Sequence, residues 1–199
     1  MQQMWTDIDH YIDSHLIPED PNLQFALENT ANQGFPDHLA VAPNQGMLLQ
    51  MLIQMNQCKR VLELGTFAAY STVWLARTLP KDGYLLTIEG RDTHAALAQQ
   101  NIDHAQFEVP VELKVGRAAD ILREIDPTTF EPFDFIFIDA DKQSYPEYLE
   151  LTLNLSHSGT ILVLDNVIRA GDILDENNKK PSIEGIRQTF EALQNHPRI

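Results

Sequence analysis

Five short apolar runs in the later part of the chain most constrain its fold. In order, they are 60–64 (RVLEL), 84–89 (YLLTIE), 111–115 (VELKV), 133–138 (FDFIFI) and 160–164 (TILVL). Segments of helical length separate them. Runs that are apolar on both faces and alternate with helices are typical of parallel strands buried beneath helices. We therefore expect an α/β fold with a doubly wound, mostly parallel sheet of the Rossmann type.

Helices are predicted on both sides of the first strand. Apolar periodicity predicts three helices before it, at 5–16, 22–32 and 44–57. Because no repeat, low-complexity segment or linker divides the chain, we expect one domain of residues 1–199. It would consist of N-terminal helices (1–57) and an α/β core (58–199).

Two local patterns carry further expectations. Later helices are predicted at 71–79, 93–105 and 145–155, and Ser144 and Glu147 have capping-box spacing at the start of the last one. In the third N-terminal helix, Met47, Met51 and Met55 recur at helical spacing. We expect these methionines to lie mostly in the core rather than on a dimer face.

Charge and cysteine content exclude several classes of partner. The chain has 14 Lys and Arg against 29 Asp and Glu, a formal net charge of −15. Such a field repels phosphate backbones and anionic lipid surfaces, so we expect neither nucleic acid nor membrane as a partner. Cys58 is the sole cysteine, which excludes an intramolecular disulfide, and the N-terminus has no export signal. We expect a cytoplasmic protein.

The first two predicted strands end in residues suited to a nucleoside. Ligands bind at the carboxyl ends of parallel strands, and Gly65 permits a tight turn there. The segment is not G-x-G-x-x-G, because Phe67 and Tyr70 replace the later glycines, which disfavours a dinucleotide. Glu89, at the end of the second strand, can accept both hydroxyls of a ribose. A plain tight turn and a solvated glutamate remain the structural alternatives.

The fourth and fifth predicted strands end in oxygen-bearing side chains. Asp139 follows one strand directly, and Asp165 and Asn166 follow the other. Hard oxygen ligands in this number suit Mg²⁺, Mn²⁺ or Ca²⁺, although Asp165-Asn166 alone could form only an Asx turn or a helix cap. Lys142 lies close enough to act beside the cation as a general base, although a surface lysine is the default interpretation.

In combination, ELGTFAAYS, FDFIFIDADK and LVLDNV resemble the metal-dependent class I O-methyltransferases that include the caffeoyl-CoA and catechol enzymes. The resemblance covers about residue 40 to the end. It implies S-adenosylmethionine as cofactor, a divalent metal, a small catechol or phenolic substrate, and a homodimer. It implies Lys142 as general base and Asp139, Asp165 and Asn166 as metal ligands. The implied cofactor contacts are Val41, Glu63, Gly65, Thr66, Ser71, Glu89, Ala118, Asp139 and Asp141.

The sequence departs from the family pattern in three places. Ala69 stands where the family has glycine, which we expect to narrow the methionine pocket slightly. Ala170 replaces an asparagine that contacts substrate in plant members, so their substrate does not transfer. The chain stops where the family begins a C-terminal antiparallel hairpin, and we expect a truncated C-terminus rather than a different fold. Acceptor choice is expected to depend on the N-terminal helices and the loop 169–180.

The resemblance implies a mechanism and leaves rivals open. A phenolic hydroxyl has a pKa near about 10, and a divalent cation on adjacent oxygens would lower it so that the oxygen can attack the sulfonium methyl. A nucleotide-dependent oxidoreductase and a non-catalytic S-adenosylmethionine-binding module are the alternatives on this architecture. A milder alternative is a metal-independent methyltransferase that acts on an amine or a carboxylate.

Overall fold

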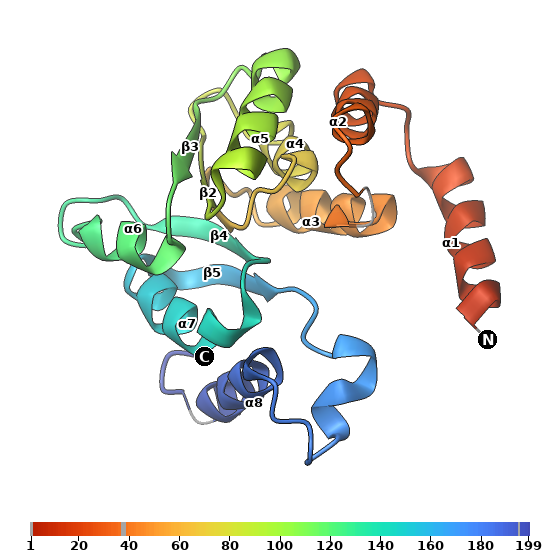
Figure 1. Cartoon of the computed structure of the whole chain (residues 1–199). Helices are drawn as coiled ribbons and strands as arrows, with labels where there is room; N and C mark the ends of the chain where they lie inside the picture. Colours follow the sequence, from red (N-terminus) through yellow and green to blue (C-terminus); the bar gives the residue numbers. More distant parts are fainter. Residues whose placement is uncertain (1, 37–38, 195) are drawn as a thin grey trace.

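The computed structural model describes residues 2–36, 39–194 and 196–199, and a five-stranded sheet forms its centre (Figure 1). The strands are β1 (Arg60–Leu64), β2 (Tyr84–Glu89), β3 (Val111–Val115), β4 (Phe133–Ile138) and β5 (Ser156–Leu164). They run in the order β3-β2-β1-β4-β5, and every pair is parallel. The predicted α/β class is confirmed.

The strand bounds agree with the sequence except at β5. This strand begins at Ser156, four residues earlier than the apolar run, because Ser156 pairs with Phe133 across a register shift. Thr160 fixes the extension: its Oγ1 accepts the His157 N–H at 2.9 Å and donates to the Phe133 carbonyl at 2.7 Å. The polar letters SHSG carry no apolar signal, so the extension was not predictable from periodicity.

Helices cover both faces of the sheet because side chains alternate along each strand. On one face, Val61 and Phe135 join a core with α3 (Pro43–Met55) and α4 (Tyr70–Ala76), and α5 (Asp92–Ala105) lies alongside, over β2 and β3. On the other face, Leu62 and Ile136 pack with α6 (Ala118–Glu124) and α7 (Tyr145–Asn154). Each fully buried large apolar side chain stabilises the fold by roughly 1.5–3 kcal/mol.

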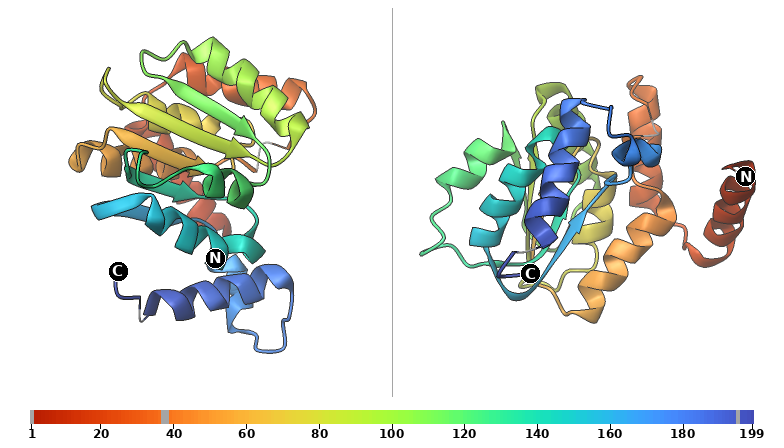
Figure 2. Two further views of the ribbon diagram at one scale, coloured as in Figure 1. Left: turned by 90° about the vertical axis from the view of Figure 1, so that its left-hand side faces the viewer. Right: turned by 90° about the horizontal axis from the view of Figure 1, so that it is seen from below.

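The N-terminal helices add a further layer outside α4 and α5. Asp20 caps α2 (Pro21–Asn32), since its Oδ1 accepts the Asn22 N–H at 2.8 Å, and its Oδ2 pairs at 2.9 Å with Arg77, which directly follows α4. Helix α1 (Gln2–Leu16) stands outermost and contacts α3 (Figure 2). The expectation for the methionines of α3 was wrong at two positions, because Met51 is 47% exposed and Met55 is 74% exposed.

The C-terminal part adds two short 3-10 helices and a final α-helix. These are η2 (Lys142–Ser144), η3 (Arg169–Leu174) and α8 (Pro181–Gln194), and α8 packs on α7 and η2 (Figure 1). The predicted start of α7 is correct, but the predicted capping box is wrong. The Ser144 hydroxyl donates to Asp141, and Glu147 pairs with Arg117 and Arg123.

The two edge strands differ in charge. Strand β3 carries Glu112 and Lys114, whereas residues 160–164 of β5 carry no charged side chain. Within 2–36, 39–194 and 196–199 no strand is antiparallel, so both edges lack a further partner there. Over the same residues, none of the helices has the length and apolar character needed to cross a membrane.

Candidate active site

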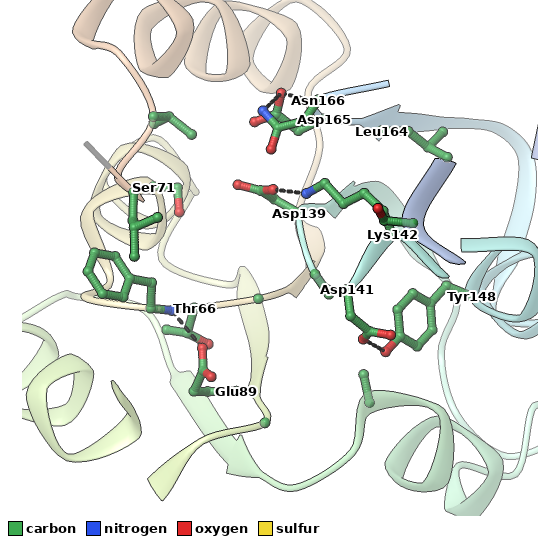
Figure 3. Close-up of a pocket in the computed structure, with 18 of the residues that line it drawn as sticks. Thr66, Ser71, Glu89, Asp139, Asp141, Lys142, Tyr148, Leu164, Asp165 and Asn166 are labelled. Atoms are coloured by element: carbon green, nitrogen blue, oxygen red, sulfur yellow. Dashed lines mark hydrogen bonds and ion pairs between the residues drawn. The ribbon is translucent and has the colours of Figure 1, made fainter. Parts of the chain in front are cut away.

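An open cleft of about 1620 Å³ lies at the carboxyl ends of β1, β2, β4 and β5 (Figure 3). Parallel sheets of this type bind ligands at that end. Nearly all residues predicted for the site line it, from both the nucleoside and the metal groups. They are Val41, Gly65, Thr66, Ser71, Glu89, Ala118, Asp139, Asp141, Lys142, Asp165 and Asn166. The exception is Glu63.

Gly65 allows β1 and β4 to approach each other closely at the floor of the cleft. Its φ of +95° lies in the left-handed region, and a Cβ there would stand 2.2 Å from the carbonyl oxygen of Asp139. The backbone of Asp139 is in turn tied to β1, because its N–H donates to the Leu64 carbonyl at 2.8 Å. No residue with a side chain fits at position 65 without moving Asp139.

Glu63 is a fully buried carboxylate behind the cleft wall rather than part of the wall. It accepts hydrogen bonds from three hydroxyls, those of Ser71 at 2.6 Å, Thr72 at 2.5 Å and Thr87 at 2.7 Å. Burial raises its pKa to about 7, although the three hydroxyls oppose that shift. Glu63 holds the hydroxyl of Ser71, and Ser71 does line the cleft.

The nucleoside end of the cleft is organised around Glu89. Its Oε2 accepts the Phe67 N–H at 2.8 Å and its Oε1 accepts the Arg91 N–H at 2.9 Å, so backbone groups hold both oxygens of the carboxylate. Phe67 has a φ of +48°, an uncommon value for a side-chain-bearing residue. This turn therefore places the Phe67 N–H toward Glu89 and the Phe67 ring 5.0 Å from that of His94.

Ala69 does not narrow the cleft. It is fully buried outside the lining, where it packs with Ala98 and Ile102, so the expected effect on the methionine pocket is wrong. Ala69 instead has a left-handed backbone conformation at the start of α4, with a φ of +58°. Because glycine adopts this conformation without penalty, alanine costs on the order of 1 kcal/mol here.

Asp141 is held on the opposite side of its loop from Asp139. The Tyr148 hydroxyl donates to it at 2.5 Å, and the Ser144 hydroxyl also donates to it. Figure 3 shows its carboxylate turned toward Tyr148 rather than toward the other acids. Asp141 and Ala118 both line the cleft, but Asp141 is not part of the cluster of Asp139, Asp165 and Asn166.

The acids at the ends of β4 and β5 share one end of the cleft. Lys142 Nζ donates to Asp139 Oδ1 at 2.5 Å, and Gln45 of α3 donates to Asp165 Oδ2 at 2.9 Å. Burial raises the pKa of Asp139; Lys142 opposes that shift, and the charge of Asp165 adds to it. The two carboxylates therefore lie within electrostatic reach of each other (Figure 3).

The chemistry of this donor set fits a divalent cation. Asp139, Asp165 and Asn166 supply hard oxygen ligands, and the repulsion that Asp165 exerts on Asp139 is the kind that a bound cation relieves. In the described part of the chain, no group of three or more Asp, Glu, His or Cys side chains is arranged for a metal. A cation here would thus depend on two carboxylates and an amide.

Two residues that shape the acid end were not predicted. Gln45 reaches Asp165 across 120 positions of sequence, and no local pattern marks it. Arg187 of α8 supports η3 from below, since its guanidinium donates to the carbonyls of Ile173 at 3.0 Å, Asp175 at 2.5 Å and Asn178 at 2.9 Å. Arg187 of α8 thus holds the backbone of the loop 169–180.

Comparison with known proteins agrees with this geometry. A sequence model described as O-methyltransferase matches residues 14–199. A catechol O-methyltransferase of Niastella koreensis is 48% identical over 96% of this chain and 86% of its own length. One of Mycobacterium tuberculosis is 38% identical over 96% and 84%.

Solved structures give the same assignment. An O-methyltransferase from Bacillus cereus in complex with SAH has a TM-score of 0.94 at 42% identity, covering 100% of this chain and 90% of its own. TomG of Streptomyces achromogenes, an O-methyltransferase of tomaymycin synthesis in complex with SAM, has a TM-score of 0.91 at 40% identity, with 97% and 86% covered. The chain belongs to the O-methyltransferase family.

Proposed function

We propose that this protein is an S-adenosylmethionine-dependent O-methyltransferase that uses a divalent metal and acts on a catechol-like or phenolic hydroxyl. The observation that carries the proposal is the convergence of Asp139, Lys142, Asp165 and Asn166 at one end of a cleft whose other end holds Glu89. Relatives named catechol O-methyltransferase and neighbours solved with SAM or SAH support it.

The proposed cofactor contacts follow the cleft wall. Glu89 would accept the ribose hydroxyls, since each of its oxygens is oriented by a backbone N–H and keeps further acceptor capacity. Ala118 would face the base, and Gly65, Thr66 and Ser71 would border the amino-acid portion together with Val41 and Asp141. Glu63 would act indirectly, by holding the Ser71 hydroxyl.

The proposed chemistry takes place at the acid end. A cation held by Asp139, Asp165 and Asn166 would lower the pKa of a bound phenolic hydroxyl and orient it. Lys142, as the neutral amine, would accept the hydroxyl proton at Nζ, an atom that lies 2.5 Å from Asp139 Oδ1. The deprotonated oxygen would then attack the sulfonium methyl, so that the O–CH3 bond forms as the S–CH3 bond breaks and S-adenosylhomocysteine leaves. Because the step neutralises charge, alignment by the surrounding residues supplies much of the rate.

A substrate panel tests this function. Catechols, caffeoyl esters and simple phenols are incubated with S-adenosylmethionine, with Mg²⁺ or after exhaustive chelation. We expect methyl transfer to adjacent hydroxyls only when the metal is present. Transfer that survives chelation would contradict the metal. Cofactor binding without transfer to any acceptor would favour a non-catalytic module, and binding of NAD(H) in place of S-adenosylmethionine would favour an oxidoreductase.

We also propose a homodimer and a cytoplasmic location. Apolar side chains exposed on α1 and α3, among them Trp5, Leu48, Met51 and Met55, support an interface between copies. Sedimentation velocity would test it. The free, buried Cys58 is compatible with a reducing compartment. We also propose that nucleic acid is not a partner, because the net charge of −15 would repel a phosphate backbone.

A further inference from the structure

Most basic side chains of this acidic protein are paired. Eleven of the fourteen Lys and Arg side chains hold an ion pair or a hydrogen bond. Over residues 2–36, 39–194 and 196–199, the side chains of Arg91, Arg169 and Lys180 have neither. With 29 acids in the chain, partners are not scarce, and yet Arg91 and Arg169 both line the cleft.

Arg169 lies at the acid end within electrostatic reach of Asp139, but its side chain holds no ion pair or hydrogen bond with any residue that the structure describes. It follows Asp165 and Asn166 on the same segment and is exposed toward solvent. Arg169, Ala170 and Gly171 have successive φ values of +49°, +54° and +93°. The first two are strained for residues with side chains, and such strain gathers at functional sites. The Arg187 contacts to Ile173, Asp175 and Asn178 hold the adjoining backbone in place.

The surroundings of Arg169 would otherwise repel anions. Asp139, Asp165 and Asp172 line the same part of the cleft, and the whole chain carries a formal charge of −15. Lys142 is already committed to Asp139. A side-chain cation that holds no ion pair would therefore favour the binding of an anionic acceptor there.

We propose that Arg169 binds an anionic substituent of the methyl acceptor, so that the preferred acceptors are catechols that carry a carboxylate. This inference rests on the proposed function and names its substrate class. A guanidinium presents parallel N–H donors that match the two oxygens of a carboxylate. The strained, clamped backbone would hold that fork at the cleft mouth while the catechol oxygens face the acid cluster.

A matched pair of acceptors tests the proposal. One is 3,4-dihydroxybenzoate and the other is its neutral methyl ester, which keeps the catechol and removes the charge. We expect the wild type to favour the acid. Arg169→Gln should lower kcat/KM for the acid by about ten- to a hundredfold, mainly through KM, because a hydrogen bond to a charged group is lost. The ester should change by less than twofold.

Two further variants make the test specific. Lys180→Gln removes the third unpaired cation, which does not line the cleft, and should leave both acceptors unaffected. Arg169→Lys keeps the charge without the planar fork and should recover part of the preference for the acid. If Arg169→Gln weakens both acceptors equally, or if the wild type shows no preference for the acid, the proposal is wrong.

Direct binding separates this inference from the proposed function. Calorimetry follows each acceptor binding to the wild type and to Arg169→Gln in the presence of S-adenosylhomocysteine and Mg²⁺. Arg169-dependent binding of the acid without any methyl transfer would overturn the proposed function and leave this inference standing. Efficient methylation with equal affinity for acid and ester would do the reverse.

Discussion

Gly185 of α8 lies against the backbone of Lys142: a Cβ added at Gly185 would stand 2.4 Å from the Lys142 carbonyl oxygen. The same Cβ would stand 2.7 Å from Cα of Gln143. These neighbours are backbone atoms, which cannot rotate away as a flexible side chain can. The close contact between α8 and η2 at Gly185 thus fixes the position of η2, which carries Lys142.

Substitution of Gly185 by alanine should therefore affect catalysis from outside the cleft. We expect Gly185→Ala to displace η2 and to lower the free energy of unfolding by about 1–3 kcal/mol, as overpacking does. Turnover should fall more than cofactor affinity, since Glu89 and its neighbours lie on other strands. Urea unfolding, calorimetry and initial rates measure the three quantities. Gln188→Ala, on the exposed side of α8, is the control and should change none of them.

Loss of one proposed metal ligand should separate binding from turnover. Asp165→Ala removes the carboxylate that accepts from Gln45 and Asn166, but leaves the Glu89 end untouched. We expect S-adenosylmethionine affinity to stay within about tenfold while most turnover is lost, because the step depends on orientation at the acid end. Chelation of the wild type should reproduce the loss. Activity that persists in both experiments would argue against the metal.

The carboxylate of Glu89 should matter for binding of the cofactor. Glu89→Gln turns one of two backbone-facing oxygens into a donor, which then meets the N–H of Phe67 or Arg91. We expect cofactor affinity to drop by about ten- to a hundredfold, since a charged acceptor is lost as well. Calorimetry measures the affinity, and an unchanged dissociation constant would place the ribose elsewhere.

Glu63 should make stability depend on pH. Its pKa is raised from 4.5 to about 7 by burial, so the folded state binds the proton more tightly than the unfolded state does. The protonated form therefore stabilises the fold at low pH, and this contribution is lost as pH rises through the window between these values. The total is on the order of 3 kcal/mol.

A difference measurement isolates this effect. Urea unfolding of the wild type and of Glu63→Gln is followed from pH 5 to pH 8. The wild type should lose stability relative to the variant across that range, because glutamine does not titrate. A difference that stays constant with pH would show that Glu63 is charged in the folded state across this range, as it is in the unfolded chain.

The strand positions could be predicted because each strand carries its own signal. Buried parallel strands need apolar residues on both faces, and β4 ends where FIFI meets Asp139, a change of chemistry that marks the strand end. The same reasoning placed Asp139, Asp165 and Glu89 at one edge of the sheet, and the cleft contains all three. In a parallel sheet the carboxyl ends of separate strands lie next to one another, so a site formed by strand ends can be predicted from the sequence.

Tertiary partners account for what could not be predicted. Ser144 and Glu147 have the spacing of a capping box, but Asp141, Arg117 and Arg123 are better partners in the folded chain. Glu63 accepts a hydrogen bond from the hydroxyl of Thr87, 24 residues away. Its burial behind the cleft wall therefore follows only from the pairing of the strands. Gln45 of α3 meets Asp165 only through the tertiary position of that helix, 120 residues away in the sequence.

The guanidinium of Arg187 donates hydrogen bonds to backbone carbonyl oxygens, which every amino acid has. The side chain of Ile173 can therefore be exchanged while the guanidinium keeps its hydrogen bonds, whereas the side chains of Asp175 and Asn178 also accept the backbone N–H groups of Asn177 and Lys180. Substitutions at residues that line the cleft can therefore change which acceptors bind without changing the backbone of the loop. Libraries randomised at Ile168 and Asp172, which line the cleft, with Arg187 retained should yield folded proteins with diverse acceptor preferences.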